Sequence, residues 1–307
     1  MTTEINNKIV YLHMGFHKTG TTSLQHILTH NKEEIKKQGF FYPNFECEYS
    51  DLPIKIINNS VPICSLFVDD VKNYKFNMKM NVVHCINEVN DSYLQQFDKI
   101  LSDNNKIIIS GEGISLLSNN SLYNLKLHII EKGFKIVPII IVRSPYSNMC
   151  SIVQQKIKGG HYVDLNNIDC VSLQKKINKI KDIFNDCNPI IIPYKRYHFA
   201  GTVGLILDAI GIDMKNISYK NLNISLNNKI IRLRNELNKK EPIIVDGKIN
   251  DKHIKINDMK KIENDDKKFL LTKQELFLHM DEICKENEYL LKELGKEFCD
   301  VDFPTCD

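Results

Sequence analysis

The chain has 307 residues, of which 42% are hydrophobic and 26% charged, with 9 prolines and 13 glycines. This composition is that of an ordinary globular protein and excludes a disordered, collagen-like or disulfide-scaffold chain. Lysine and arginine number 41 against 38 acidic residues, and the net charge of +3 is too small to indicate a nucleic-acid-binding protein without a clustered basic face. Any anion site in this chain must therefore be local.

The sequence predicts a cytoplasmic protein without a membrane anchor. The longest apolar stretch, residues 136–142, contains Pro138 and is closed by Arg143, far short of the roughly 20 residues that span a bilayer. The polar segment 1–8 lacks the basic and apolar regions of a secretory signal. The nine cysteines are scattered singly, with no Cys-x-x-Cys pair, which favours reduced thiols over disulfides or a zinc site.

Apolar runs typical of buried strands alternate with helical patterns along the chain. Strands are predicted at 8–14, 106–110, 134–142 and 190–194. Helices are predicted at 21–37, 86–101, 122–132, 145–158, 173–184 and 202–210, where Gly39 follows the first helix and Pro145 opens the fourth. Repeated strand-then-helix units are typical of a doubly wound parallel sheet with helices on both faces. We therefore expect a three-layer α-β-α fold that binds ligands at the carboxyl ends of its strands.

The remaining segments lack this regularity. Residues 42–80 show little pattern, and residues 238–268 are dense in Lys, Asp, Asn and Glu, so we interpret the second stretch as an exposed excursion. Residues 272–294 carry apolar side chains at near-helical spacing and are expected to form a helix that packs on the core. No repeat or low-complexity linker divides the chain. We therefore predict one domain, with a variable insertion at about 44–85 and C-terminal helical cover at about 228–298.

The first strand-to-helix junction concentrates polar side chains. It reads His13-Met14-Gly15-Phe16-His17-Lys18-Thr19-Gly20-Thr21-Thr22-Ser23. A glycine-containing loop between a strand and a helix directs backbone N–H groups and the positive helix end at one point, which makes an anion site, and Lys18 adds a charge. The segment departs from the nucleotide motif GxxxxGK[ST], because Lys18 precedes Gly20 and no Lys-Ser/Thr pair follows, so the motif places no magnesium ligand here. The alternative is a polar turn in which Thr21 or Thr22 caps the helix.

A second motif follows the third predicted strand, in Arg143-Ser144-Pro145-Tyr146-Ser147-Asn148-Met149-Cys150-Ser151. Arg143 offers a planar, permanently charged group suited to phosphate, and Ser151 lies about two turns into the helix that Pro145 opens. The alternative is that Arg143 is a surface residue and Ser151 a hydroxyl on the helix face.

Glu112 follows the second predicted strand and is flanked by Gly111 and Gly113. A carboxylate at the carboxyl end of a strand next to the loop is placed to accept a proton from a hydroxyl. The alternative is a salt bridge that orients Lys18 or Arg143.

These motifs resemble those of the sulfotransferases. The pattern His13-x-Gly15-x-x-Lys18-Thr-Gly-Thr-Thr-Ser-Leu-Gln25, followed by Asn31 and by Gly39-Phe-Phe-Tyr-Pro43, is similar to bacterial members that act on carbohydrates or other small hydroxyl acceptors. The resemblance implies a P-loop nucleoside-triphosphate-hydrolase-like sulfotransferase fold. It also implies 3′-phosphoadenosine 5′-phosphosulfate (PAPS) as the sulfuryl donor and adenosine 3′,5′-bisphosphate as a product, with no metal.

In this family the loop holds the 5′-phosphosulfate and its lysine reaches the bridging oxygen. The resemblance therefore implies that this group is bound by Lys18, Thr19, Gly20, Thr21, Thr22 and Ser23. It implies that Arg143 and Ser151, whose separation of eight residues matches the family, bind the 3′-phosphate. Glu112 would be the general base, as in several carbohydrate-sulfating members, whereas cytosolic aryl and steroid members use a histidine.

Further residues are candidates on weaker patterns. His17 adjoins Lys18 and His161 follows the Arg143 helix, and each is considered as a substrate contact, with an ordinary loop histidine as the alternative. Lys195-Arg196 stands where the family has a strand-end motif near the nucleotide, often with an acidic residue. Asn223-x-Ser225 is similar to a segment of bacterial relatives that precedes the C-terminal helices. The C-terminal Arg-Lys-Gly loop of the cytosolic members has no clear counterpart.

The predicted function is transfer of a sulfuryl group from PAPS to an acceptor hydroxyl, with a sugar hydroxyl favoured over a lipid or small-molecule alcohol. Two alternatives stay open at this point: a P-loop kinase that uses ATP and magnesium, and a non-catalytic module that binds a nucleotide or a sulfated glycan. The predicted partner is a small-molecule or glycan acceptor, with no nucleic acid and no transmembrane segment.

Overall fold

The computed structural model describes residues 8–49, 54–195, 201–219, 227–245, 248–253, 267–300 and 303. The chain divides into two compact units. The first comprises Met1–Val142 and Lys175–Asn221, and the second comprises Arg143–Gln174 and Leu222–Asp307. Each unit is described by itself, and the expectation of one domain stays a prediction.

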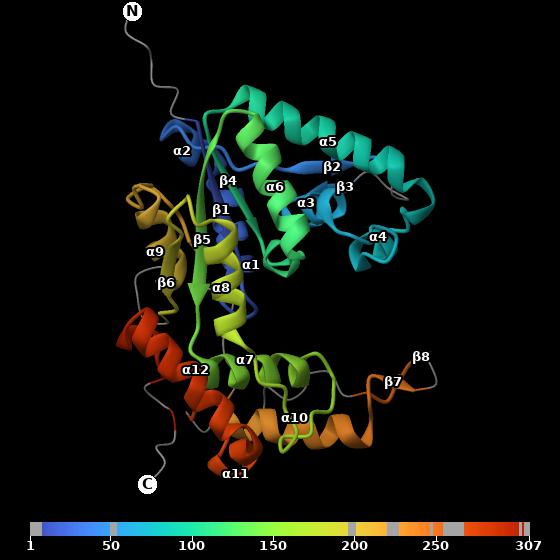
Figure 1. Cartoon of the computed structure of the whole chain (residues 1–307). Helices are drawn as coiled ribbons and strands as arrows, with labels where there is room; N and C mark the ends of the chain where they lie inside the picture. Colours follow the sequence, from blue (N-terminus) through green and yellow to red (C-terminus); the bar gives the residue numbers. More distant parts are fainter. Residues whose placement is uncertain are drawn as a thin grey trace, which may run out of the picture. The chain divides into compact units, whose positions relative to one another are not determined.

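A four-stranded sheet forms the centre of the first unit (Figure 1). Its strands are β4 (Lys106–Gly111), β1 (Ile9–Met14), β5 (Lys135–Val142) and β6 (Ile190–Pro193), in that order. All three strand pairs are parallel, so the predicted strands and their parallel arrangement are confirmed. In the pairing of β1 with β4, Met14 lies opposite Gly111. The segments that follow these two strands therefore leave the sheet side by side.

Helices cover both faces of this sheet, as an α/β fold requires. One apolar cluster joins α1 (Thr21–His30) and α9 (Gly201–Ala209) to alternate residues of β5 such as Ile139 and Ile141. On the other face lie α6 (Asn119–Glu131) and α8 (Leu173–Ile183), of which the first two residues of α8 belong to the second unit. Because β-strand side chains alternate between faces, β5 contributes apolar side chains to both layers.

The remaining elements of the first unit are short apart from one long helix. They are α2 (Lys32–Lys37), β2 (Phe45–Cys47), β3 (Ile54–Ile56), α3 (Ser60–Phe67), α4 (Lys75–Lys79), η1 (Val83–Cys85), α5 (Ile86–Asp103) and η2 (Gly113–Leu116). The strands β2 and β3 form an antiparallel hairpin inside the stretch that showed little sequence pattern. The predicted long helix at α5 is confirmed.

The predicted helix at 21–37 is in fact two helices, α1 and α2, that meet at Asn31. The side chain of Asn31 explains the break. Its amide donates to the carbonyls of Ile27 and Ser218, at 2.8 and 2.9 Å, and its oxygen accepts from the Ser218 backbone N–H at 2.9 Å. An asparagine side chain that binds main-chain groups competes with the helical hydrogen bonds, and this tertiary contact ends the helix.

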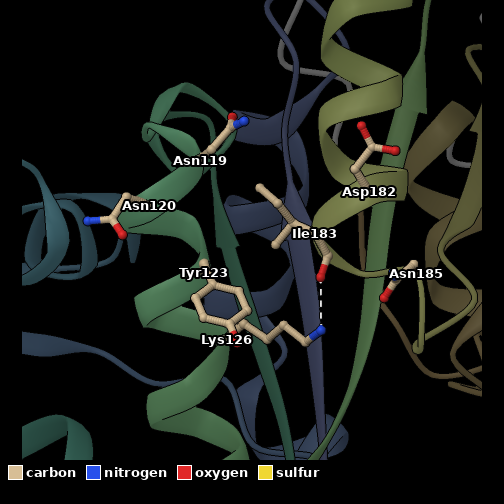
Figure 2. A pocket seen from close by; sticks show the side chains of 7 residues that line it. All are labelled: Asn119, Asn120, Tyr123, Lys126, Asp182, Ile183 and Asn185. Atoms are coloured by element: carbon tan, nitrogen blue, oxygen red, sulfur yellow. Dashed lines mark hydrogen bonds between the residues drawn. The ribbon is translucent and has the colours of Figure 1, made fainter.

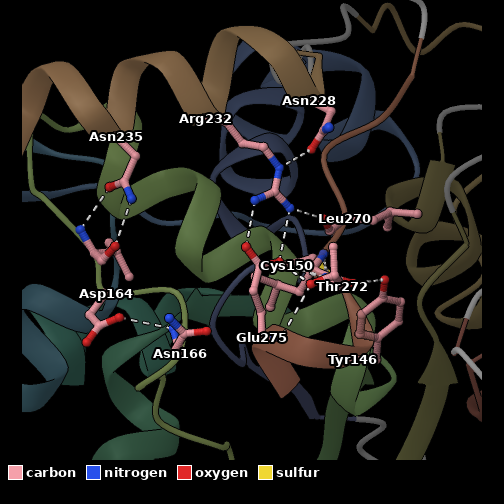
Figure 3. Close-up of polar contacts among 12 residues, drawn as sticks. Tyr146, Cys150, Asp164, Asn166, Asn228, Arg232, Asn235, Leu270, Thr272 and Glu275 are labelled. Carbon is pink, nitrogen blue, oxygen red and sulfur yellow. Dashed lines mark hydrogen bonds and ion pairs between the residues drawn. The ribbon is translucent and has the colours of Figure 1, made fainter. Parts of the chain in front are cut away.

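The second unit is mainly helical. It contains α7 (Pro145–Lys158), α10 (Asn228–Lys240), the short strands β7 (Ile244–Val245) and β8 (Lys248–Ile249), α11 (Lys273–Leu276), η4 (Phe277–His279), α12 (Met280–Glu293) and η5 (Lys296–Phe298). Its core joins α7, α10 and α12 through residues such as Val153, Ile231 and Ile283. Figure 3 shows polar contacts that fix this packing, including the bidentate pair of Arg232 with Glu275 and the Tyr146 hydroxyl, which donates to the Leu271 carbonyl at 2.8 Å.

Two expectations for this region need correction. The stretch predicted as an exposed excursion contains the end of α10 and the β7–β8 hairpin. The single helix predicted at 272–294 is α11, a 3-10 turn and α12. Leu276, Ile283 and Leu290 are all fully buried at a spacing of seven residues, so the apolar period continues across the break and conceals it in the sequence.

Among the described residues, no helix combines the length and the apolar character needed to cross a bilayer.

Candidate functional site

The loop that follows β1 has a backbone suited to close ligand approach. Lys18 and Gly20 both have left-handed conformations, with φ of 65° and 98°. The Thr19 hydroxyl donates to the Phe16 carbonyl at 2.7 Å and closes the loop on itself. A Cβ on Gly15 would overlap the Thr21 hydroxyl, so this position accepts only glycine without rearrangement. The loop is therefore compact and folded by its own contacts.

The amino end of α1 carries the features of an anion site. Gly20 is the N-cap and makes no side-chain cap, and the first turn contains no acidic residue. The first hydrogen bond of the helix runs from the Leu24 N–H to the Gly20 carbonyl, so the amides of Thr21 and Thr22 precede the helical ladder. Within the described part of the chain, the buried Thr21 hydroxyl lacks a hydrogen-bond partner. A buried polar atom is normally paired, so this hydroxyl in the first residue of α1 is an unsatisfied group next to the loop.

Glu112 lies at the end of β4, next to this loop. The glycines on either side of it allow α3 to pack closely: a Cβ on Gly111 would lie 2.7 Å from the Ser60 backbone nitrogen, and one on Gly113 would lie 3.0 Å from the Cys64 sulfur. The Ser115 hydroxyl lies 2.9 Å from the carbonyl oxygens of both Gly15 and Glu112. One hydroxyl thus ties the segment after β4 to the start of the loop after β1.

His17 is the residue that contacts the Glu112 carboxylate. Its Nδ1 lies 3.1 Å from Oε1 of Glu112, and both side chains are partly exposed to solvent. The sequence offered His17 as a substrate contact and offered Lys18 or Arg143 as the alternative partner of Glu112. The geometry instead pairs the two candidate residues with each other. This contact brings the carboxylate against the lysine-bearing loop within the first unit.

Two lysines of α8, which the sequence did not single out, face the same segments. The Lys179 ammonium donates to the carbonyls of Ser115 and Leu117, each at 2.8 Å. The Lys176 ammonium lies 5.8 Å from the centroid of the buried Phe16 ring, just before His17 in the loop. Burial lowers the pKa of Lys176, and the charge of Glu112 opposes that shift. In the sequence, the three-residue spacing of Lys176 and Lys179 shows only that the two side chains share one face of the helix. This spacing does not reveal which other element that face contacts.

His13, near the end of β1, is completely buried. Its Nδ1 lies 2.8 Å from the Ser110 hydroxyl on β4, and its Nε2 has no hydrogen-bond partner among the described residues. Burial lowers the pKa of His13 to about 4, so its ring is neutral at neutral pH. His13 therefore links β1 to β4 as an uncharged residue.

In the second unit, Arg143 lies just before α7, and Ser147 and Ser151 follow it at four-residue intervals in the helix. The Arg143 Nε donates to the Ser147 hydroxyl at 2.9 Å, and Ser151 follows one turn later, at a partly buried position. Ser147 was missed by the sequence reasoning, although it lies four residues from both Arg143 and Ser151. Arg143 is thus directed along the helix by a hydroxyl of its first turn.

Asp300 occupies the amino end of α7. Its carboxylate accepts from the backbone N–H groups of Tyr146 and Ser147, both at 2.9 Å, and from the Ser144 hydroxyl. Burial raises the pKa of Asp300, while these hydrogen bonds oppose the shift. Because a carboxylate already binds the helix end, an anion held by α7 would depend on the side chains of Arg143 and Ser151.

The weaker candidates lie apart from these contacts or outside the described residues. His161 follows the end of α7 with an exposed side chain, and its carbonyl accepts from the Asn238 amide at 2.9 Å. Its role as a substrate contact stays a prediction. Arg196 and the Asn223-x-Ser225 segment lie outside the described residues.

A cavity of about 600 Å³ lies between α6 and α8 (Figure 2). The buried Lys126 donates there to the carbonyl of Ile183 at 2.8 Å (Figure 2). It also donates to Oδ1 of Asp186 at 2.6 Å. These bonds hold the carboxyl end of α8, and Lys179 holds its middle. The helix that carries Lys176 is therefore anchored at two points.

The fold defines an α/β protein with a four-stranded parallel sheet flanked by helices, in which a glycine-containing loop joins the first strand of the sheet to α1. No family model matches the chain, and no curated protein or solved structure matches it either.

Proposed function

We propose that this chain is a sulfotransferase that moves the sulfuryl group of PAPS to a hydroxyl of an acceptor, with a carbohydrate as the favoured acceptor class. The observation that carries the proposal is the contact of His17 with Glu112 at 3.1 Å, which brings a carboxylate against the lysine-bearing loop. A phosphosulfate donor needs donors and positive charge at one place, and the acceptor hydroxyl needs a base beside it. In the first unit, the loop after β1 supplies the donors and the positive charge of Lys18, and Glu112 supplies the base beside it.

The loop residues fit the 5′-phosphosulfate by three observations. Thr21 has a buried hydroxyl that lacks a partner among the described residues, Gly15 has no room for a side chain, and the first turn of α1 contains no acidic residue. Lys18 would contribute its ammonium to the bridging oxygen. The Thr19 hydroxyl is already engaged with Phe16, so Thr19 would contribute its backbone amide. The other predicted contacts in this loop are Gly20, Thr22 and Ser23.

The reaction assigns one task to each residue. Glu112 would accept the proton of the acceptor hydroxyl while the acceptor oxygen bonds to sulfur, and the bond from sulfur to the bridging phosphate oxygen would break. The products are a sulfate ester and adenosine 3′,5′-bisphosphate. Lys18 would stabilise the negative charge that develops on the bridging oxygen. His17 would hold the Glu112 carboxylate in place between turnovers.

Arg143 and Ser151 are proposed to bind the 3′-phosphate. An arginine forms two parallel hydrogen bonds with a phosphate, and the contact with Ser147 preorients its guanidinium. This assignment would separate PAPS from ATP, which has no 3′-phosphate. Two grounds support this assignment, the sequence resemblance and the geometry of Arg143, Ser147 and Ser151 at α7.

The test is a turnover assay that follows release of adenosine 3′,5′-bisphosphate from PAPS with a panel of hydroxyl acceptors, including mono- and oligosaccharides. We expect acceptor-dependent release in the presence of a metal chelator. Binding of PAPS without release, for every acceptor, would favour the non-catalytic module. Turnover of ATP with magnesium in place of PAPS would favour the kinase.

A further inference from the structure

The lysines of helix α8 differ in their exposure to solvent. Its sequence, LQKKINKIKDI, contains four lysines in eleven residues. Lys175 is exposed to solvent, whereas Lys176 and Lys179 are partly buried and share one face of the helix at three-residue spacing. That face is the one that meets the loop after β1 and the segment after β4, as the contacts with Phe16 and Ser115 show.

The two partly buried lysines are not equivalent. Lys179 donates to two backbone carbonyls, so its ammonium serves the fold. Lys176 lies over the Phe16 ring, and among the described residues it has no hydrogen-bond or ion-pair partner at contact distance. An ammonium that loses water without gaining an acceptor pays a desolvation penalty, and the lowered pKa of Lys176 expresses that penalty.

The charges around Lys176 define what it would bind. Glu112 attracts it electrostatically without forming an ion pair, and Lys179 on the same helix repels it. Glu112 is in turn held by His17, which precedes Lys18 in the loop. An anionic group that enters between the loop and Glu112 would meet the Lys176 ammonium, and its oxygens would supply the acceptor that this lysine lacks.

We propose that Lys176 is a second ligand-binding cation of this site and binds an oxygen of the sulfuryl group of the donor. The proposal rests on the proposed function, which it extends by one residue from an element far along the chain. The anchoring of α8 by Lys126 and Lys179 supports this role, since a fixed helix holds the ammonium in place before the ligand arrives.

The test compares two ligands that differ only in the sulfuryl group. Calorimetric titrations without acceptor would give the dissociation constants of PAPS and of adenosine 3′,5′-bisphosphate for the wild type and for Lys176→Met, Lys176→Arg and Lys175→Met. We expect Lys176→Met to weaken PAPS binding about tenfold, which corresponds to about 1.4 kcal/mol, and to weaken bisphosphate binding less than twofold. Lys176→Arg should recover most of the loss, and Lys175→Met, the matched exposed control, should change neither constant.

Two results would overturn the role of Lys176. One is equal PAPS binding by the wild type and Lys176→Met, and the other is an equal loss for both ligands, which indicates a structural effect. If the wild type binds neither nucleotide, the proposed function fails, and inorganic pyrophosphate then serves as the probe. Pyrophosphate binding that Lys176→Met loses and Lys175→Met retains would still support an anion-binding Lys176. Equal binding, or none in the wild type, would contradict it.

Discussion

Acid should destabilise this protein through one buried histidine. His13 has no exposed surface, its Nε2 lacks a partner among the described residues, and burial lowers its pKa from 6.5 to about 4. A group with a lowered pKa in the folded state binds more protons when the chain unfolds. Because His13 protonates more readily in the unfolded chain, stability falls as the pH drops from about 6.5 to about 4.

The size of this effect follows from the same two values. Each unit of pKa difference corresponds to about 1.4 kcal/mol, and the two pKa values differ by about 2.5 units, so the full loss of stability is about 3 kcal/mol. A typical domain unfolds at a cost of about 5–15 kcal/mol, so this one group would remove a large share of the stability.

The assay is urea unfolding at several pH values between 7 and 4, for the wild type and for His13→Gln. The variant should be less stable at pH 7, because it loses the contact with Ser110, and its stability should depend less on pH over this range. The exposed His84 gives a matched control, so His84→Gln should keep the wild-type slope. Identical slopes for the wild type and His13→Gln would refute the assignment.

Three further predictions concern the two candidate motifs and the packing behind Glu112. Glu112→Gln should reduce turnover of PAPS by at least about 100-fold while adenosine 3′,5′-bisphosphate binding changes less than threefold, and unchanged turnover would exclude Glu112 as the base. Arg143→Ala should weaken bisphosphate binding at least about tenfold in a calorimetric titration, and an unchanged constant would remove the 3′-phosphate assignment. Gly111→Ala should cost about 1–3 kcal/mol in urea unfolding, because the new Cβ would lie 2.7 Å from the Ser60 backbone nitrogen. Gly159→Ala is the control, since its Cβ would have 3.4 Å to the nearest atom, and equal costs for both would contradict the packing argument.

The sequence predicted the regular elements of the sheet and its helices because their apolar spacing is local information. The strands β1, β4, β5 and β6 lie within one or two residues of the predicted ranges. The break at Asn31 could not be predicted in this way, since its cause is the backbone of Ser218, far along the chain. The β2–β3 hairpin was also missed, because its strands are only three residues long.

In the candidate site, too, the features that depend on local sequence were predicted and those that depend on distant contacts were not. The loop around Lys18 and the position of Glu112 could be read from single strand ends, because parallel strands bring their carboxyl ends to one edge. The partner of Glu112 could not, since the sequence suggested Lys18 or Arg143 for this role and His17 only as a substrate contact. Lys176 and Asp300 act on segments distant in the chain, so only tertiary structure reveals what they contact.

The central claim is that this chain binds a 3′-phosphorylated nucleotide in preference to ATP. The most direct measurement is the thermal unfolding midpoint with adenosine 3′,5′-bisphosphate or with ATP, each with magnesium and with a chelator. A ligand at 100 times its dissociation constant stabilises the folded chain by about 2.7 kcal/mol, which is a readily measured shift. We predict stabilisation by the bisphosphate that survives the chelator and a smaller effect of ATP. Stabilisation by ATP with magnesium alone, and none by the bisphosphate, would contradict the account.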